Sequence, residues 1–220
     1  MPRALLGAAA LATVAGLSTT TPGLAHPHVF VDVKSDLVFA EDGKLVSVRH
    51  AWRFDEGYSA FASQGLDTDG DGSLTVEELA PLAEVNVQSM AEYDYFTFVT
   101  AGNRELILAA PNEYWLQSDG GFLTLYFTVP ISEPVEVRSL PASIEVFDPT
   151  FYVSFVFVDE DPIRLDGAPQ GCKFEVTRPS GLDETSSQLL AGVGPEQREL
   201  PPELQALTVG QTNGVQLGCP

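Results

Sequence analysis

The chain has few of the side chains on which nucleophilic catalysis depends, since its 220 residues include only three histidines and two cysteines. It contains no G-x-S-x-G, no H-E-x-x-H and no glycine-rich phosphate loop. A nucleophile activated by a nearby base is therefore poorly supplied. The sequence predicts a protein that is not an enzyme.

Positive charge is also scarce, with 11 Lys and Arg against 31 Asp and Glu and a formal net charge of −20. This imbalance argues against nucleic acid or an anionic membrane surface as a partner. It suits the binding of cations, although acidity by itself also serves solubility.

No stretch reaches the roughly 18 consecutive apolar residues of a membrane-spanning helix, so no such helix is expected in the mature chain. The N-terminus has the three parts of a secretory signal peptide: Arg3, an apolar run over 5–17, and small residues before a cleavage site. Cleavage is predicted between Ala25 and His26. Residues 1–25 are therefore predicted to be the signal peptide of a protein that lies outside the cytoplasm.

The two cysteines, Cys172 and Cys219, form an isolated pair. In an oxidising compartment such a pair favours a disulfide over two free thiols, and no C-x-x-C or nearby histidine supports a cysteine metal site. The bond would tie a C-terminal segment, 181–220, back to the core. Closing so long a loop contributes roughly 3–4 kcal/mol to stability.

Residues 67–78 match the calcium loop of an EF-hand, D-x-[DN]-x-[DN]-G-x5-E. Gly72 permits the sharp turn, and a divalent cation relieves the repulsion among three closely spaced carboxylates. The motif predicts Ca²⁺ as cofactor, with Ser73 binding through its carbonyl and Thr75 directly or through water. The competing interpretation is an acidic surface turn that binds nothing. The predicted ligands are Asp67, Asp69, Asp71, Ser73, Thr75 and Glu78.

The segments beside this loop have helical patterns. Asp55 is a candidate N-cap of the preceding helix, and Thr75 with Glu78 forms a T-x-x-E capping box for the following one. Pro81 is expected to kink or restart that second helix. Because the sequence shows no second loop to pair with, Leu74 is expected to pack on the host domain. A single site predicts a modest affinity, with a Kd of about 10⁻⁴–10⁻³ M.

Closely spaced apolar alternation predicts strands on both sides of this insert. The fold class predicted is α+β, an antiparallel β core over 26–180 with one inserted EF-hand-like helix-loop-helix at 55–93. A short helix is expected near 186–190. The expected strands are 28–39, 45–54, 95–100, 105–109, 114–117, 122–129, 143–147, 152–158 and 172–177.

Two histidines, His26 and His28, lie at the start of the predicted mature chain. An N-terminal histidine binds metal through its amine and imidazole together, and His28 projects to the same face of a strand. Three nitrogen ligands suit Zn, Ni, Co or Cu. Pro27 excludes the N-terminal copper–nickel motif, which needs an amide N–H at this position. The alternative is a solvated terminus that binds no metal.

The third histidine, His50, is harder to place. A tight hairpin at 42–43 pairs residues whose numbers sum to about 85, so His50 faces residue 35, roughly 20 Å along the strand from His28. This favours a structural role for His50, unless a bulge or long-range packing brings it closer. Glu56 would instead lie beside His28. With Asp148, otherwise expected to cap a turn, the candidate metal ligands are His26, His28, His50, Glu56 and Asp148.

Several short motifs occur in one order along the chain: 26–32 (HPHVFVD), 50–56 (HAWRFDE), the 67–78 loop, 92–96 (EYDYF) and 147–149 (FDP), followed by the C-terminal cysteine. In this order the chain resembles a bacterial family of unknown function, domain of unknown function family 1007. That family is catalogued as a periplasmic component of an uncharacterised ABC-type transport system and is linked by gene neighbourhood to nickel/cobalt or zinc transporters. The resemblance implies a periplasmic accessory role in metal handling and adds weight to His26 and His28 and, to a lesser degree, to His50 and Asp148.

The function predicted from the sequence is that of a periplasmic metal-ion-binding accessory protein. Calcium is expected at the 67–78 loop, a transition metal at the N-terminal histidines, and a membrane metal transporter as partner. Two alternatives stay open: a calcium-stabilised protein-interaction module, and a copper enzyme with an N-terminal histidine brace.

Overall fold

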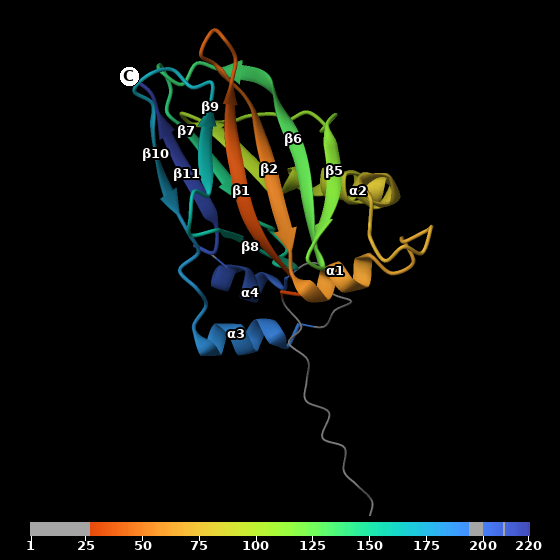
Figure 1. Cartoon of the computed structure of the whole chain (residues 1–220). Coiled ribbons are helices and arrows are strands. Elements are labelled where there is room, and N and C mark those ends of the chain that lie inside the picture. Colours follow the sequence, from red (N-terminus) through yellow and green to blue (C-terminus); the bar gives the residue numbers. More distant parts are fainter. Residues whose placement is uncertain (1–26, 194–199, 209) are drawn as a thin grey trace, which may run out of the picture.

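Two β-sheets packed around one shared hydrophobic core form the frame of the protein (Figure 1). The computed structural model describes residues 27–193, 200–208 and 210–220. Helices lie at one end of the sheets and beside one edge, which confirms the α+β class. Within the described residues no helix is both long and apolar enough to cross a membrane.

The larger sheet has the strand order β5-β6-β2-β1-β8, and β9 also pairs with β1. The predicted β1–β2 hairpin is confirmed, and Ser35 lies opposite His50. Its turn is a three-residue loop with Gly43 at φ 82°, and a bulge near Val46 restores the register that sums to 85. The strands are β1 (Val29–Phe39), β2 (Leu45–Phe54), β5 (Tyr114–Asp119), β6 (Phe122–Val135), β8 (Val153–Phe157) and β9 (Ile163–Asp166).

This sheet is mixed, which corrects the expectation of a purely antiparallel core. Strand β1 pairs antiparallel with β2 but parallel with both β8 and β9. Parallel neighbours cannot be joined by a tight hairpin. Both strands reach β1 only after the chain has passed through the second sheet, and local turn patterns do not reveal such long-range pairing.

The second sheet is antiparallel, with the order β10-β11-β7-β3-β4. Strand β11, which the sequence patterns missed, lies between β10 and β7. The C-terminal segment therefore supplies a central strand in addition to its disulfide. The strands are β3 (Thr97–Ala101), β4 (Arg104–Glu105), β7 (Ala142–Val146), β10 (Lys173–Thr177) and β11 (Asn213–Gly218).

Helices α1 and α2 flank the acidic loop, and their N-termini carry the expected caps. The Asp55 carboxylate accepts from the Tyr58 N–H at 2.9 Å, and Thr75 and Glu78 form a capping box. In Figure 1, α1, α3 and α4 lie at the lower end of the sheets, and α2 packs beside β5. The helices are α1 (Glu56–Ala62), α2 (Val76–Met90), α3 (Glu184–Ala191) and α4 (Pro202–Gln205), with 3₁₀ turns η1 (Ala91–Phe96) and η2 (Ala206–Thr208).

Helix α2 is one continuous helix through Pro81, so the expected restart does not occur. Pro81 forgoes only one intrahelical hydrogen bond, close to the N-terminus where several N–H groups lack helical partners in any case. Its apolar face holds the helix against the core. The buried residues of this face are Leu79, Ala83, Val87 and Met90.

Candidate functional site

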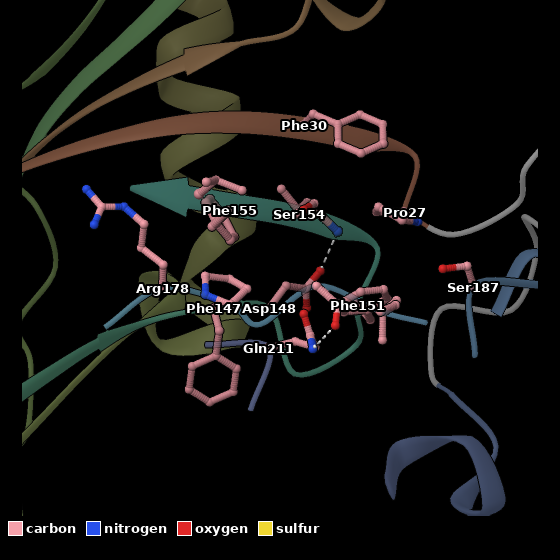
Figure 2. Close-up of a pocket in the computed structure, with 15 residues that line it drawn as sticks. Pro27, Phe30, Phe147, Asp148, Phe151, Ser154, Phe155, Arg178, Ser187 and Gln211 are labelled. Atoms are coloured by element: carbon pink, nitrogen blue, oxygen red, sulfur yellow. Dashed lines mark hydrogen bonds between the residues drawn. The ribbon is translucent and has the colours of Figure 1, made fainter. Parts of the chain in front are cut away.

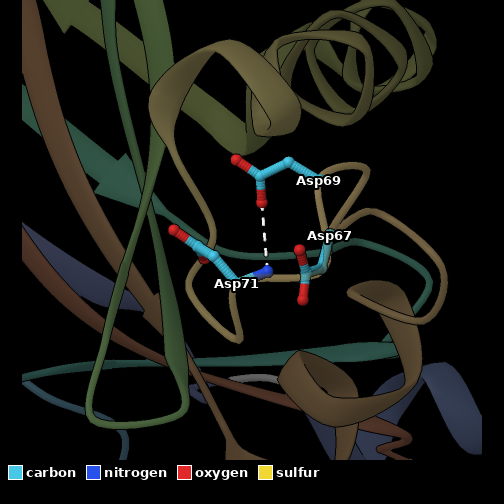
Figure 3. Close-up of side chains that lie close together, drawn as sticks. All are labelled: Asp67, Asp69 and Asp71. Atoms are coloured by element: carbon cyan, nitrogen blue, oxygen red, sulfur yellow. Dashed lines mark hydrogen bonds between the residues drawn. The ribbon is translucent and has the colours of Figure 1, made fainter.

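The acidic loop between α1 and α2 brings three aspartates together (Figure 3). One carboxylate oxygen from each of Asp67, Asp69 and Asp71 lies within 4.8 Å of the others. The three groups are exposed or half-buried, and they come from alternate residues of a single loop. Hard carboxylate oxygens at this spacing are the donors that Ca²⁺ prefers.

Backbone amides hold these carboxylates in place. Asp67 accepts from the N–H groups of Gly70 and Gly72 at 2.7 and 3.0 Å, which fastens the first residue of the loop to its sharp turn. Asp69 accepts from Asp71, and Asp71 accepts from Ser73. Gly72 has a φ of 84°, a conformation that glycine adopts without steric cost. Each aspartate thus uses part of its acceptor capacity to shape the loop and keeps part for a ligand.

Glu78 closes the loop from the first turn of α2. One of its oxygens accepts from the N–H and hydroxyl of Thr68, and the other accepts from the N–H and hydroxyl of Thr75. These donors stabilise the carboxylate, so the pKa of Glu78 falls to about 2, with the Thr75 N–H as the largest cause. The two ends of the loop are therefore joined through one anionic side chain.

Thr68 is the residue that the motif did not single out. The pattern leaves the second loop position open, yet the Thr68 hydroxyl lies 2.8 Å from Glu78 Oε1. The only signal in the sequence from which this contact could have been predicted is a hydroxyl or similar donor at the second loop position. The four hydrogen bonds occupy most of the acceptor capacity of Glu78, so a bound cation would compete with the two threonine hydroxyls for it.

Leu74 packs against the main hydrophobic core, as expected for a loop without a partner loop. A pocket of about 380 Å³ separates the loop from the β5–β6 hairpin, and Leu74, Gly120 and Gly121 are among its lining residues. The loop is therefore held to the rest of the domain through Leu74.

Of the predicted N-terminal metal ligands, His26 and the cleavage residue Ala25 lie outside the described residues. His28 lies just before β1, where its N–H donates to the Tyr152 carbonyl at 2.8 Å and its ring lies 4.7 Å from that of Tyr152. Glu56 is the exposed first residue of α1. Its neighbour Asp55 accepts from the Phe30 N–H, which brings this turn beside the start of β1.

His50 lies in the core, remote from this end of the sheet. Ser35 Oγ lies 2.8 Å from Nδ1, and Thr97 Oγ1 lies 3.1 Å from Nε2. Because the Thr97 hydroxyl donates to the Tyr95 carbonyl, Nε2 must donate to Thr97 and Nδ1 must accept from Ser35. Burial lowers the pKa of His50 to about 3. Both ring nitrogens are engaged, so the geometry supports the structural role rather than metal ligation.

Asp148 is buried and caps a turn, as expected for its simpler role. One carboxylate oxygen accepts from the N–H and hydroxyl of Thr150, both at 2.7 Å. The other accepts from the Val153 N–H at 2.9 Å. The turn places Asp148 and His28 on either side of the 152–153 segment, while His50 stays apart from both.

The disulfide between Cys172 and Cys219 is present, as the sequence predicted. It adjoins the paired residues Lys173 and Gly218 of β10 and β11. Neither cysteine is therefore available as a metal ligand or nucleophile, which agrees with the absence of a cysteine-based site motif.

The fold and the loop together define an α+β protein with an acidic, cation-compatible surface site. The family model described as protein of unknown function (DUF1007) matches residues 11–219, and the chain belongs to this family. An uncharacterized protein of Haemophilus influenzae is 24% identical over 171 residues, which are 77% of this chain and 80% of the relative. An uncharacterized 15.5 kDa protein of Spirochaeta aurantia, from the trpE 3' region, is 26% identical over 99 residues, 45% of this chain and 70% of the relative.

Proposed function

We propose that the 67–78 segment is an EF-hand that binds one Ca²⁺ and that the protein is a non-enzymatic metal-ion-binding accessory protein of the periplasm. The main support is the cluster of carboxylate oxygens of Asp67, Asp69 and Asp71 within 4.8 Å of one another. Their loop begins after one helix and ends in the capped first turn of the next, as an EF-hand loop does.

The donor set fits calcium better than a softer ion. It offers carboxylates from the three aspartates and Glu78, with the Ser73 carbonyl and Thr75 in the remaining loop positions. The threonine bonds of Glu78 hold the loop closed without metal and must partly give way when the cation binds. This competition, together with the single loop, supports a Kd of about 10⁻⁴–10⁻³ M rather than a tighter one.

Calcium at 10 mM should therefore stabilise the protein by about 1.4–2.7 kcal/mol, because a ligand that binds only the folded state contributes RT ln(1 + [L]/Kd). For a chain of this size the melting temperature should rise by about 3–10 °C. Differential scanning calorimetry with 10 mM CaCl₂ or with EGTA measures this shift.

A matched pair of variants tests the loop assignment. Glu78→Gln removes the proposed bidentate ligand, whereas Glu77→Gln removes an exposed carboxylate in the same helical turn. The calcium-dependent shift should vanish in Glu78→Gln and persist in Glu77→Gln. Equal shifts in both variants would show that calcium acts through general charge screening, and the assignment would be wrong.

We further propose that the protein serves a membrane metal transporter and that a transition metal (Zn, Ni, Co or Cu) binds at His26 and His28. The support is the position of His28 at the start of β1, next to the predicted mature N-terminus. His50 is left out of this proposal because hydrogen bonds engage both of its ring nitrogens. Asp148 is left out because its carboxylate binds the Val153 N–H, on the side of the 152–153 segment opposite His28. The test compares the protein that starts at His26 with a form that has one extra N-terminal residue. If zinc, nickel and copper each bound the two forms with the same affinity, this second proposal would be refuted.

A further inference from the structure

The free edge of β8 borders a pocket of about 380 Å³ (Figure 2). Strand β8 pairs with β1 on one side, and no described strand (within 27–193, 200–208 or 210–220) pairs with its other side. The pocket is mainly apolar, with Phe147, Phe151 and Leu182 among its lining residues. A cavity of this size and character fits a small ligand or one peptide residue.

Side chains occupy the two ends of this strand edge. Asp148 accepts from the Val153 N–H at 2.9 Å. Asn213 accepts from the Phe157 N–H at 2.8 Å and donates to the Phe155 carbonyl at 2.7 Å. These two side chains replace a neighbouring strand and block the addition of a long one.

Between them, one backbone acceptor and one donor face the pocket. In a strand the N–H and C=O of a residue point to the same side. The Val153 N–H and the Phe155 carbonyl bind Asp148 and Asn213, away from β1, so the Val153 carbonyl and the Phe155 N–H face the same way. Neither group has a hydrogen-bonding partner within the described part of the chain, and both residues line the pocket. An acceptor and a donor spaced two residues apart match the N–H and C=O of a single bound residue.

Asp148 adds a negative charge at the same place. It is 6% exposed, and no ion pair to it is formed by the residues that the structure describes. Its Oδ2 accepts one hydrogen bond, from Val153, and so retains capacity for another. Arg178, at the far side of the pocket, points away from Asp148 and donates to the carbonyls of Phe157 and Val158 (Figure 2). A buried carboxylate without a counter-ion favours a cationic ligand.

We propose that this pocket binds an α-aminoacyl group with a free ammonium and an apolar side chain, from an amino acid or the amino end of a peptide. The ammonium donates to Asp148 and to the Val153 carbonyl, the ligand carbonyl accepts from the Phe155 N–H, and the side chain contacts Phe151. This site is separate from the calcium loop and does not depend on its function.

NMR titration of the ¹⁵N-labelled, calcium-saturated protein with L-phenylalaninamide tests the proposal. The amide resonance of Phe155 should shift and saturate. N-acetyl-L-phenylalaninamide should bind about 10–100-fold more weakly, because it lacks the charged donor. Glycinamide should also bind more weakly, because it lacks the apolar side chain. Free L-phenylalanine and the dipeptide Phe-Ala-amide distinguish the two sources. Tighter binding of free L-phenylalanine indicates an amino acid as the ligand, and tighter binding of the dipeptide amide indicates the amino end of a peptide.

Asp148→Asn should weaken phenylalaninamide binding at least about tenfold. Because Asp148 also holds a turn, Ser187→Trp provides a second variant that fills the pocket from α3 without touching that turn. Glu184→Gln, an exposed change on the same helix, is the control and should bind normally. If the Phe155 amide resonance did not shift, the proposal would be overturned, and this includes the case in which residues of the chain itself fill the pocket. Undiminished binding by Ser187→Trp would also overturn it.

Discussion

The buried His50 should make the stability of the protein depend on pH below neutrality. Its imidazole is 1% exposed, is held neutral between Ser35 and Thr97, and lies about 5 Å from the rings of Trp52 and Phe127. Adding a proton would place a charge there and convert Nδ1 from an acceptor into a donor. The experiment therefore measures how the unfolding free energy changes on acidification from pH 7 to pH 5, in the parent protein and in His50→Gln.

The magnitude follows from the pKa of His50. Burial lowers it from 6.5 to about 3, so between these values the unfolded chain binds a proton that the folded protein excludes. The stabilisation by neutral His50 is fully present above pH 6.5 and is lost progressively as the pH falls towards 3. Between pH 7 and pH 5 the unfolding free energy should drop by about 2 kcal/mol from this residue alone.

Urea denaturation at pH 7, 6 and 5, with calcium held constant, measures this dependence. The drop from pH 7 to pH 5 should be about 2 kcal/mol smaller in His50→Gln than in the parent, whatever the absolute stability of the variant. His28→Gln, a change at the half-buried start of β1, should retain the contribution of His50. Equal pH dependence in His50→Gln and the parent, or an imidazole that titrates near pH 6.5 by NMR, would show that the folded protein does not exclude a proton from His50.

Three further predictions concern the rest of the frame and the loop. Reducing or substituting the disulfide, as in Cys172→Ser, should cost about 4 kcal/mol for a loop closed over 47 residues, and urea midpoints under oxidising and reducing conditions check this. Asp55→Ala should cost about 1–2 kcal/mol by denaturation, because it removes the cap of α1 and an acceptor for the Phe30 N–H, whereas the neighbouring Glu56→Ala should change little. Because the pKa of Glu78 is lowered from 4.5 to about 2, its contribution to folding stability is fully present above pH 4.5 and is lost as the pH falls towards 2. NMR titration of its side-chain carboxyl carbon should show this low midpoint. A midpoint near 4.5 would contradict the hydrogen bonds that close the loop.

Much of the local structure could be predicted because its causes are local. The register that places His50 opposite Ser35 agrees with the expectation from a tight turn at 42–43, but only because one bulge compensates for a loop that is one residue longer. The caps at Asp55 and Thr75 follow from side chains within three residues of the N–H groups that they satisfy. The spacing of the loop aspartates is likewise set by the loop itself.

What could not be predicted depends on contacts distant in sequence. The parallel pairing of β1 with β8 and β9, and the insertion of β11 between β10 and β7, arise only when the two sheets pack. Strand β11 begins with Asn213 and Gly214, which have low strand propensity. Asn213 nevertheless has a defined role, because its side chain binds the backbone of β8 from the second sheet.

The loop between α1 and α2 is proposed here to bind one calcium ion. Native mass spectrometry of the untagged protein exported to the periplasm, with and without a calcium chelator, tests it most directly. The parent protein should carry one calcium per chain, the chelator should remove it, and Asp67→Ala should lack it. A parent protein without calcium at millimolar free Ca²⁺, or an Asp67→Ala variant that retains the ion, would contradict it.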